Sequence, residues 1–433
     1  MNPVAWPGVK HNAALSQATA ALSTSHEHFL RSRAGRTPVF ARLLQSSILQ
    51  IAILLIAAFS APALAASDKD IGALAQLAGQ GDRNAIVKLL ELARSGDADA
   101  QTQIGWLYYE GRVVQRNYPL AREWFLNAAA KDQAEAMNLL GHLYQEGMGT
   151  DRNYVEAARW YRQAAELGLA AAANNLGWLY LKGDGAAKNP VLARQWFERA
   201  ADKGHAVALY NLGYLYAEGL GCEQDQEQAL AWYRKSAALG YPAAMRAIGW
   251  HYQEGRGVAQ DYAIAKNWYE KAAAQGDFEA EAMIGQLFQH GRGVPRDLAA
   301  ARQHYEMAAK GGDAAGELLL GWLYQQGLGV TRDYAAALSW YRKSAEQGNA
   351  DAQNNLGYLY DEGLGIARDY KEAFAWYRKA AEQEQASALF NLGLMYEEGR
   401  GTTRNLDEAF RYYRMAADHG HAQAKRILGE AGQ

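Results

Sequence analysis

A single residue spacing constrains this chain more than any other feature. Glycine recurs at a constant interval of 36 residues, at Gly105, Gly141, Gly177, Gly213, Gly249, Gly285, Gly321, Gly357, Gly393 and Gly429. A fixed period of this length indicates a repeat protein, in which each unit buries its apolar face against its neighbours. A chain of 433 residues is also too long for one compact core, which agrees with an array.

The first half of each unit predicts a helix. Alanine lies five residues before the repeating glycine, leucine or isoleucine one before it and tyrosine three after it, as in Ala172, Leu176 and Tyr180. These positions fall on one helical stripe, and the small residues let a neighbouring helix approach closely. A G-x-G pair follows, for example Gly219 and Gly221, where glycine can adopt the left-handed conformation that ends a helix.

The second half predicts another helix, because an Asp or Asn precedes it in every unit. Such a side chain accepts hydrogen bonds from the free amides of the first turn, worth about 1 kcal/mol. The predicted caps are Asn117, Asn153, Asn189, Asp225, Asp261, Asp297, Asp333, Asp369 and Asn405.

Within the second helix, Ala193, Trp196 and Ala201 and their equivalents predict a buried stripe. Seven of the nine units close this helix with glycine, while Asp132 and Glu384 depart from the pattern. The chain is therefore predicted to be all-α, a right-handed α-solenoid of nine 36-residue helix-turn-helix repeats with capping helices at both ends.

This pattern predicts four segments. Residues 1–65 form an N-terminal extension with a signal peptide, 66–96 form N-terminal capping helices, 97–420 hold the nine repeats, and 421–433 form a C-terminal capping helix.

The first segment resembles an export signal. Positive charge between Arg31 and Arg42 precedes an apolar stretch, Ile48–Phe59, and the small residues around Ala65 suit cleavage before Ala66. We therefore expect a periplasmic or secreted protein. The alternative is an uncleaved anchor in the inner membrane with the repeats facing the periplasm, although twelve residues are short of the roughly 20 that span a bilayer. Membrane contact is expected only through this segment, if it stays uncleaved.

Charge and cysteine content exclude several classes of protein. The formal net charge is −3, and residues 1–65 carry +4 of it, which leaves −7 for the remainder. A chain of this charge is not expected to bind nucleic acid, which requires clustered Lys and Arg. Cys222 is the only cysteine and stands in a loop position filled elsewhere by residues such as Val258, so we expect it to be a small buried apolar residue.

The sequence predicts no catalytic residue, metal site or cofactor. Motifs such as G-x-S-x-G and H-E-x-x-H are absent. His251, His290, His419 and His421 lack the carboxylate spacing of a zinc site.

A second stripe on the first helix predicts a ligand groove. Asparagine recurs two residues before the repeating glycine, and an aromatic residue recurs one after it. Exposed asparagine can bond both N–H and C=O of an extended peptide, or a sugar hydroxyl, and aromatic faces supply apolar contact. The alternative is that the rings pack between adjacent repeats. The candidate groove residues are Asn175, Trp178, Asn211, Tyr214, Trp250, Trp322, Asn355, Tyr358 and Asn391.

Charged residues recur around the loop between the two helices. Glutamates such as Glu110 and Glu362 lie five residues after the glycine, and arginines such as Arg116 and Arg368 lie just before the second cap. The glutamates could make the groove acidic, but we favour a loop salt bridge between the two sets.

The unit resembles the Sel-one-like repeat (SLR) family, relatives of the tetratricopeptide repeats. The resemblance rests on the L-G-x-x-Y, G-x-G and W-Y-x-x-A-A patterns and covers roughly residues 70–429. It implies an α-solenoid that acts as an adaptor holding other proteins, with exported bacterial members associated with envelope assembly, polysaccharide export, signalling and host contact. A cysteine-rich subgroup has been linked to penicillin binding and β-lactamase-like activity, and this chain lacks the paired cysteines of that subgroup.

These observations predict an exported scaffold for protein-protein interaction in the bacterial cell envelope, with an extended protein or peptide partner held in its concave groove. A polysaccharide-binding or export accessory factor is the alternative partner class. A β-lactamase-like or cell-wall enzyme is the least favoured interpretation.

Overall fold

The computed structural model describes residues 70–431. The chain divides into two compact units, one up to Glu91 and one from Leu92 onward. The described part of the first unit consists of α2 (Ile71–Gly79) and most of α3 (Arg83–Ser95), which continues past the boundary. Asp70 caps α2 by accepting a hydrogen bond from the amide of Ala73.

The second unit contains nine consecutive helix pairs followed by α22 (Ala422–Ala431). The first helices of the pairs are α4 (Ala98–Glu110), α6 (Ala134–Glu146), α8 (Ala170–Lys182), α10 (Ala206–Glu218), α12 (Pro242–Glu254), α14 (Phe278–His290), α16 (Ala314–Gln326), α18 (Ala350–Glu362) and α20 (Ala386–Glu398). The second helices are α5 (Tyr118–Ala129), α7 (Tyr154–Glu166), α9 (Pro190–Ala201), α11 (Gln226–Ala238), α13 (Tyr262–Ala273), α15 (Leu298–Lys310), α17 (Tyr334–Glu346), α19 (Tyr370–Ala381) and α21 (Leu406–Asp418).

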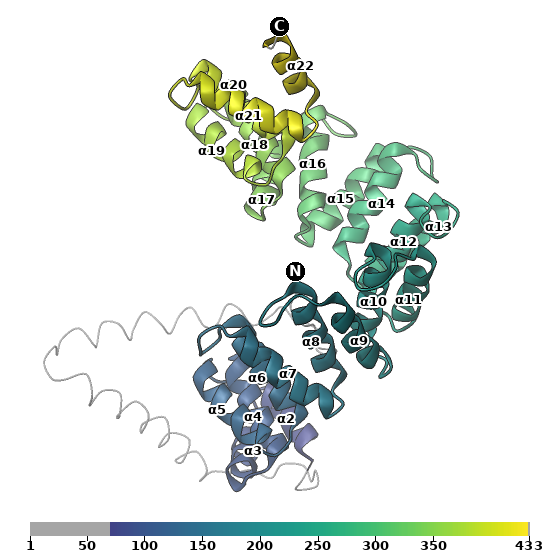
Figure 1. Ribbon diagram of the computed structural model, residues 1–433, viewed down its shortest axis with the longest axis vertical. Helices are drawn as coiled ribbons and strands as arrows, with labels where there is room; N and C mark the ends of the chain where they lie inside the picture. The colour runs from purple at the N-terminus through teal and green to yellow at the C-terminus, as the bar shows by residue number, and fades with distance from the viewer. Residues whose placement is uncertain (1–69, 432–433) are drawn as a thin grey trace, which may run out of the picture. The chain divides into compact units, whose positions relative to one another are not determined.

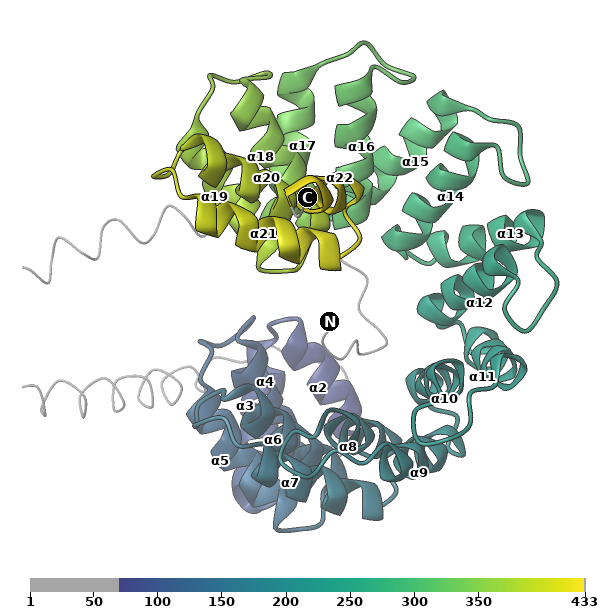
Figure 2. The ribbon, with the colours of Figure 1, turned by 45° about the horizontal axis from the view of Figure 1, so that its top comes forward.

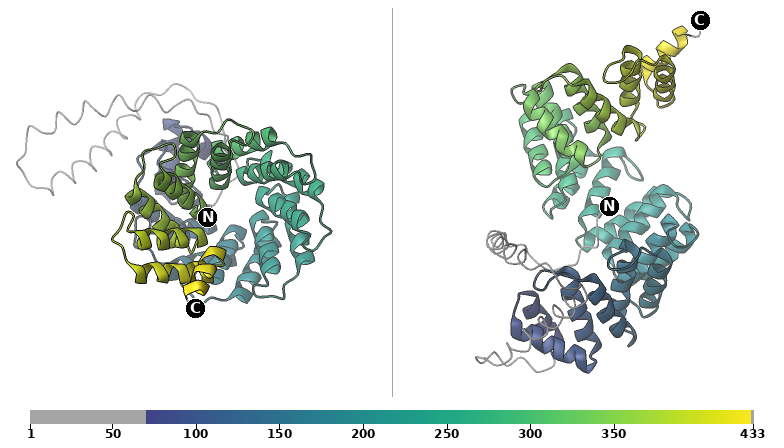
Figure 3. Two further views of the ribbon diagram at one scale, coloured as in Figure 1. Left: turned by 90° about the horizontal axis from the view of Figure 1, so that it is seen from above. Right: turned by 90° about the vertical axis from the view of Figure 1, so that its left-hand side faces the viewer.

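Each first helix packs on the second helix of its own repeat, and each second helix packs on the first helix of the next repeat. The order of the pairs can be followed from α4 to α21 in Figures 1 and 2, and from two further directions in Figure 3. This nearest-neighbour packing confirms the predicted all-helical solenoid of 36-residue units.

The repeating position requires glycine, because an aromatic ring of the second helix lies directly on it. A Cβ atom on Gly141 would lie 2.6 Å from the ring of Tyr161, and the equivalent clash recurs in every repeat. The rings are at most 4 % exposed. They belong to Phe125, Tyr161, Phe197, Tyr233, Tyr269, Tyr305, Tyr341, Tyr377 and Tyr413. Any side chain at the glycine would therefore separate the two helices of its repeat.

The predicted buried stripe of the second helix is confirmed for Ala193 and Trp196, which are buried, whereas Ala201 is half-buried. The deepest ring of the helix is the residue after the tryptophan, such as Phe197 next to Trp196. Most of the tryptophans are half-buried and lie under a basic side chain, as Trp232 lies 3.8 Å from the Lys235 ammonium. They close the outer edge of the core.

The predicted caps of the second helices are confirmed. All nine Asp or Asn side chains accept a hydrogen bond from a first-turn amide, for example Asn117 from Leu120 at 3.0 Å and Asp225 from Gln228 at 2.9 Å. This side chain satisfies one of the free amides at each helix start.

The G-x-G pair performs two separate tasks. Its first glycine ends the first helix in the left-handed conformation, as at Gly219 with φ of +68°. Its second glycine lies against the backbone of the preceding repeat, so that a Cβ on Gly221 would be 2.4 Å from the Pro190 carbonyl carbon. The two departures from the closing glycine of the second helix, Asp132 and Glu384, keep the left-handed conformation, at φ of +58° and +61°. The backbone geometry is thus constant where the residue is not.

Candidate binding surface on the first helices

Three amide-amide hydrogen bonds join neighbouring first helices, and we call them the asparagine ladder. Asn175 donates through Nδ2 to Oδ1 of Asn138 at 3.0 Å, Asn211 to Asn174 at 2.8 Å, and Asn391 to Asn354 at 3.0 Å. Each donor lies two residues before the repeating glycine, and each acceptor lies three residues before the glycine of the preceding repeat. The ladder therefore links the repeats to one another.

The expectation that the asparagines are exposed is wrong for Asn211, which is 2 % exposed. Its amide is used by the bond to Asn174, because a buried amide must find a partner. Asn175 and Asn391 are half-buried and bonded in the same way. Asn355 differs. The acceptor position in the preceding repeat is occupied by Leu318, whose side chain cannot accept a hydrogen bond.

The candidate aromatic residues also differ among themselves. Trp178 lies edge-on to Phe197 of its own repeat, with 6.0 Å between ring centroids. Trp250 is covered by the guanidinium of Arg256 at 4.6 Å. Tyr214 is half-buried, whereas Tyr358 is 41 % exposed. Packing within and between repeats thus accounts for much of the surface of these rings, in line with the alternative interpretation of the stripe.

The structure brings two of the candidate residues, Trp322 and Asn355, into one cavity of about 390 Å³. All of its lining residues belong to the first helices α14, α16 and α18 or to the start of α20. The other seven candidates do not line it. Leu318, Leu319 and Asp351 also line it, and they are not among the predicted residues. The asparagine pattern is absent from repeats 5 to 7, residues 242–349, so its interruption alone does not distinguish the leucines of repeat 7.

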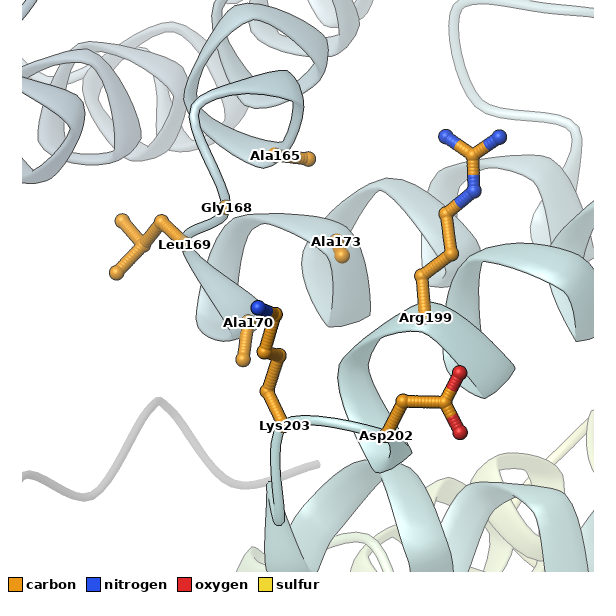
Figure 4. A pocket seen from close by; sticks show the side chains of 8 residues that line it. All are labelled: Ala165, Gly168, Leu169, Ala170, Ala173, Arg199, Asp202 and Lys203. Carbon is orange, nitrogen blue, oxygen red and sulfur yellow. The ribbon is translucent and has the colours of Figure 1, made fainter.

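A second cavity, of about 240 Å³, lies where α7, α8 and α9 meet. Figure 4 shows Arg199, Asp202 and Lys203 along the end of α9, near the small side chains of Ala170 and Ala173 in α8. Its three charged side chains are exposed and of mixed sign. The guanidinium of Arg199 also lies 4.4 Å from the centre of the Trp196 ring. This cavity therefore offers little basis for a ligand site.

The expected loop salt bridge is replaced by a different contact. Arg116 donates to the backbone carbonyl of Glu110 at 2.9 Å, and Arg404 donates to the carbonyl of Glu397 at 2.8 Å. These arginines therefore satisfy free carbonyls at the C-terminal ends of first helices. Two of the glutamates pair instead with other loop arginines, Glu110 with Arg112 at 3.6 Å and Glu398 with Arg400 at 2.6 Å, while Glu362 is exposed.

The histidines and the cysteine lie in separate environments. His251 is fully buried, its Nδ1 is 2.9 Å from the Arg256 carbonyl oxygen, and burial lowers its pKa. His290 is exposed. Between residues 70 and 431 no group of three His, Cys, Asp or Glu side chains is placed to hold a metal ion. Cys222 packs against the core as an apolar residue would, but it is half-buried and not buried as expected.

Comparison with known proteins decides the family. The Sel1 repeat model matches nine consecutive segments, 98–133, 134–169, 170–205, 206–241, 242–277, 278–313, 314–349, 350–384 and 386–421. This chain is a Sel1 repeat protein. The match covers most of the chain and agrees with the helix pairs of the structure.

Two solved structures resemble this Sel1 repeat protein in sequence and fold. A protective antigen of uropathogenic Escherichia coli strains with an SLR fold is 32% identical, with a TM-score of 0.53 and coverage of 80% of this chain and 82% of that chain. A Sel1 repeat protein from Oxalobacter formigenes is 36% identical, with a TM-score of 0.53 and coverage of 58% and 100%. No curated protein matches the chain. Among the described helices of this Sel1 repeat protein, none has the length and apolar character needed to cross a bilayer.

Proposed function

We propose that this protein is a non-enzymatic scaffold that holds an extended segment of a partner protein against its first helices. The observation that carries the proposal is the cavity lined by residues of four successive repeats, from Gln289 in α14 to Ser387 in α20. A ligand that contacts four helices in a row must be elongated. Its apolar and amide lining suits a polypeptide, which offers both side chains and a hydrogen-bonding main chain.

The cavity has a size typical of a ligand site. A volume of about 390 Å³ accommodates several side chains of a peptide, and sites of this class commonly measure about 300 to 1,000 Å³. Trp322 supplies an apolar surface, while Asn355 supplies a hydrogen-bond donor and an acceptor. Sugar binding has less support, because Trp178 and Trp250 are covered by Phe197 and Arg256.

We further propose that the protein is exported to the periplasm or beyond the cell. The support is the charged, apolar and small-residue pattern of residues 31–65, which lies outside the described residues. Sequencing the N-terminus of the protein isolated from the periplasm should give Ala66 as the first residue. An intact leader in the inner-membrane fraction would show the anchored alternative instead.

Selection from a displayed library of random dodecapeptides tests the scaffold proposal, with the mature chain from Ala66 as target. We expect enrichment of related peptides that bind in extended form. A library from which no peptide is enriched, together with binding to a glycan array, would contradict the proposal. Turnover of a cephalosporin reporter by the same preparation would contradict its non-enzymatic part.

A further inference from the structure

The cavity lies where the asparagine ladder is interrupted. In repeats 2 to 4, within residues 134–241, two ladder bonds join α6 to α8 and α8 to α10. Repeats 5 to 7 have no asparagine at the two ladder positions, which hold Arg246 and Ala247, then Ala282 and Met283, then Leu318 and Leu319. The ladder resumes at the bond from Asn391 to Asn354, and Asn354 forms an edge of the cavity. The cavity therefore lies at the end of the three repeats that lack the ladder, next to the repeat in which it resumes.

The floor of the cavity is apolar. Leu318, Leu319 and Trp322 are half-buried, and each packs with one side against the core below. Their remaining surface faces the cavity. Removing such surface from water favours an apolar side chain of a ligand at this place.

The wall opposite the leucines is polar and comes from one face of α18. Asp351, Asn354 and Asn355 lie at spacings of three and four residues, so they project from the same side of the helix. Gln385 adds an amide from the start of α20 and donates to Oδ1 of Asp351 at 3.2 Å. Amide groups in this arrangement match the main chain of an extended peptide.

The ionisable lining of the cavity is negative. Asp351 is the only ionisable residue in its lining, and its carboxylate is exposed. No Lys, Arg or His lines the cavity. One oxygen of Asp351 accepts from Gln385, and a carboxylate has further acceptor capacity on both oxygens. The complementary ligand group is therefore a cation.

We propose that this cavity binds an extended peptide that combines an apolar side chain with a lysine or arginine. The apolar side chain contacts Leu318, Leu319 and Trp322, and the cation pairs with Asp351. Asn355 bonds the peptide main chain between these two points. The inference rests on the proposed scaffold function, and it names both the repeats that bind and the chemistry of the partner.

The chain offers a matched control for Asp351. Asp99 occupies the same repeat position in α4 and accepts from Gln133, as Asp351 accepts from Gln385. Asp99 is also exposed, but it does not line the cavity. The two substitutions Asp351→Asn and Asp99→Asn therefore remove the same group from the same local setting.

The test uses dodecapeptides selected on the mature chain, labelled with fluorescein and titrated by fluorescence anisotropy. We expect the selected peptides to contain Lys or Arg near an apolar residue. Asp351→Asn should weaken their binding about three- to fivefold at low salt, as for a partly exposed ion pair, and Asp351→Lys should weaken it further. Asp99→Asn should leave it unchanged.

Two results would overturn the inference while leaving the scaffold proposal intact. One is selection of peptides without a cation, and the other is an equal effect of Asp351→Asn and Asp99→Asn on binding. Failure to select any peptide would overturn the scaffold proposal as well. Circular dichroism of each variant checks that it is folded. Substitution of an exposed aspartate is expected to change the stability of the fold little.

Discussion

Residues 134–241 and residues 278–387 have the same helices, caps and loops, yet their first helices present different surfaces. The first region, which we call the sealed region, carries two bonds of the asparagine ladder, and Asn211 is buried there. The second, the open region, has leucine at the equivalent positions of repeat 7 and contains the cavity. The surface of the first helices thus varies with the side chains at two positions of each repeat, while the backbone pattern stays constant.

The largest difference is expected from removing one asparagine in each region. Asn211→Ala leaves Oδ1 of Asn174 buried without its partner and should lower the free energy of unfolding by about 1–3 kcal/mol. Asn355→Ala should lower it by no more than about 0.5 kcal/mol, because Asn355 has no ladder bond to repeat 7. Urea unfolding followed by circular dichroism measures both. Equal losses would remove the distinction between the regions.

A histidine in the repeat between the two regions should make the stability of the protein depend on pH. His251 stands where the sealed region has Leu215 and the open region has Leu323, both fully buried. Burial lowers the pKa of His251 below its usual 6.5, and its Nε2 is buried without a hydrogen-bond partner among the described residues. Below pH 6.5 the unfolded chain binds a proton that the folded chain does not, so stability is complete above that pH and falls as the pH drops.

His251→Leu should remove part of this dependence. The variant should lose less stability than the wild type between pH 7 and pH 5, because it has no imidazole to protonate at this position. Burial also lowers the pKa values of His142, His205 and His421, so some dependence on pH remains in the variant. Melting temperatures at a series of pH values measure the effect, and parallel curves for the two proteins would contradict it.

Closing the open region should separate binding from stability. Leu318→Asn gives Asn355 the acceptor that Asn174 gives Asn211, and the new bond, worth about 1 kcal/mol, offsets the lost apolar contact. We expect the free energy of unfolding to change by less than about 1 kcal/mol and the affinity for selected peptides to fall several-fold. Leu318→Ala removes the same contact without the bond and should be less stable. An alanine variant as stable as the asparagine variant would show that no ladder bond forms.

The smallest effect should be the same near both regions. Asp132 and Glu384 hold left-handed backbone without glycine. Asp132→Gly and Glu384→Gly should each raise the free energy of unfolding by about 0.5–1 kcal/mol, because glycine adopts this conformation without steric cost. Differential scanning calorimetry would detect the shift. A loss of stability in either variant would mean that its side chain supplies a contact that outweighs the strain.

The sequence was sufficient for the fold because each equivalent position has an equivalent task. The glycine period, the Asp and Asn caps and the G-x-G stops all follow from local backbone chemistry, and the structure agrees with each of them. The ladder could not be read in this way, since its partners are 37 residues apart and occupy two different repeat positions. A period identifies which residues are alike, but it does not identify which residues touch.

The candidate site was only partly predictable for the same reason. Trp322 and Asn355 fit the repeated pattern, whereas Leu318 and Leu319 line the cavity without belonging to it. Repeat 6 departs from the pattern as well, with Ala282 and Met283, and neither residue lines the cavity. The contact of Arg116 with a carbonyl oxygen was also hidden, because nearby Glu110 offers a more obvious partner in the sequence.

Hydrogen exchange of the chain from Ala66 onward, with and without a selected peptide, tests the central claim most directly, because it compares the two regions in one sample. Bound peptide should slow amide exchange in α16, α18 and the start of α20, and leave α6, α8 and α10 unchanged. Protection confined to the sealed region, or spread equally over both, would contradict the assignment of the binding site to the interruption of the ladder.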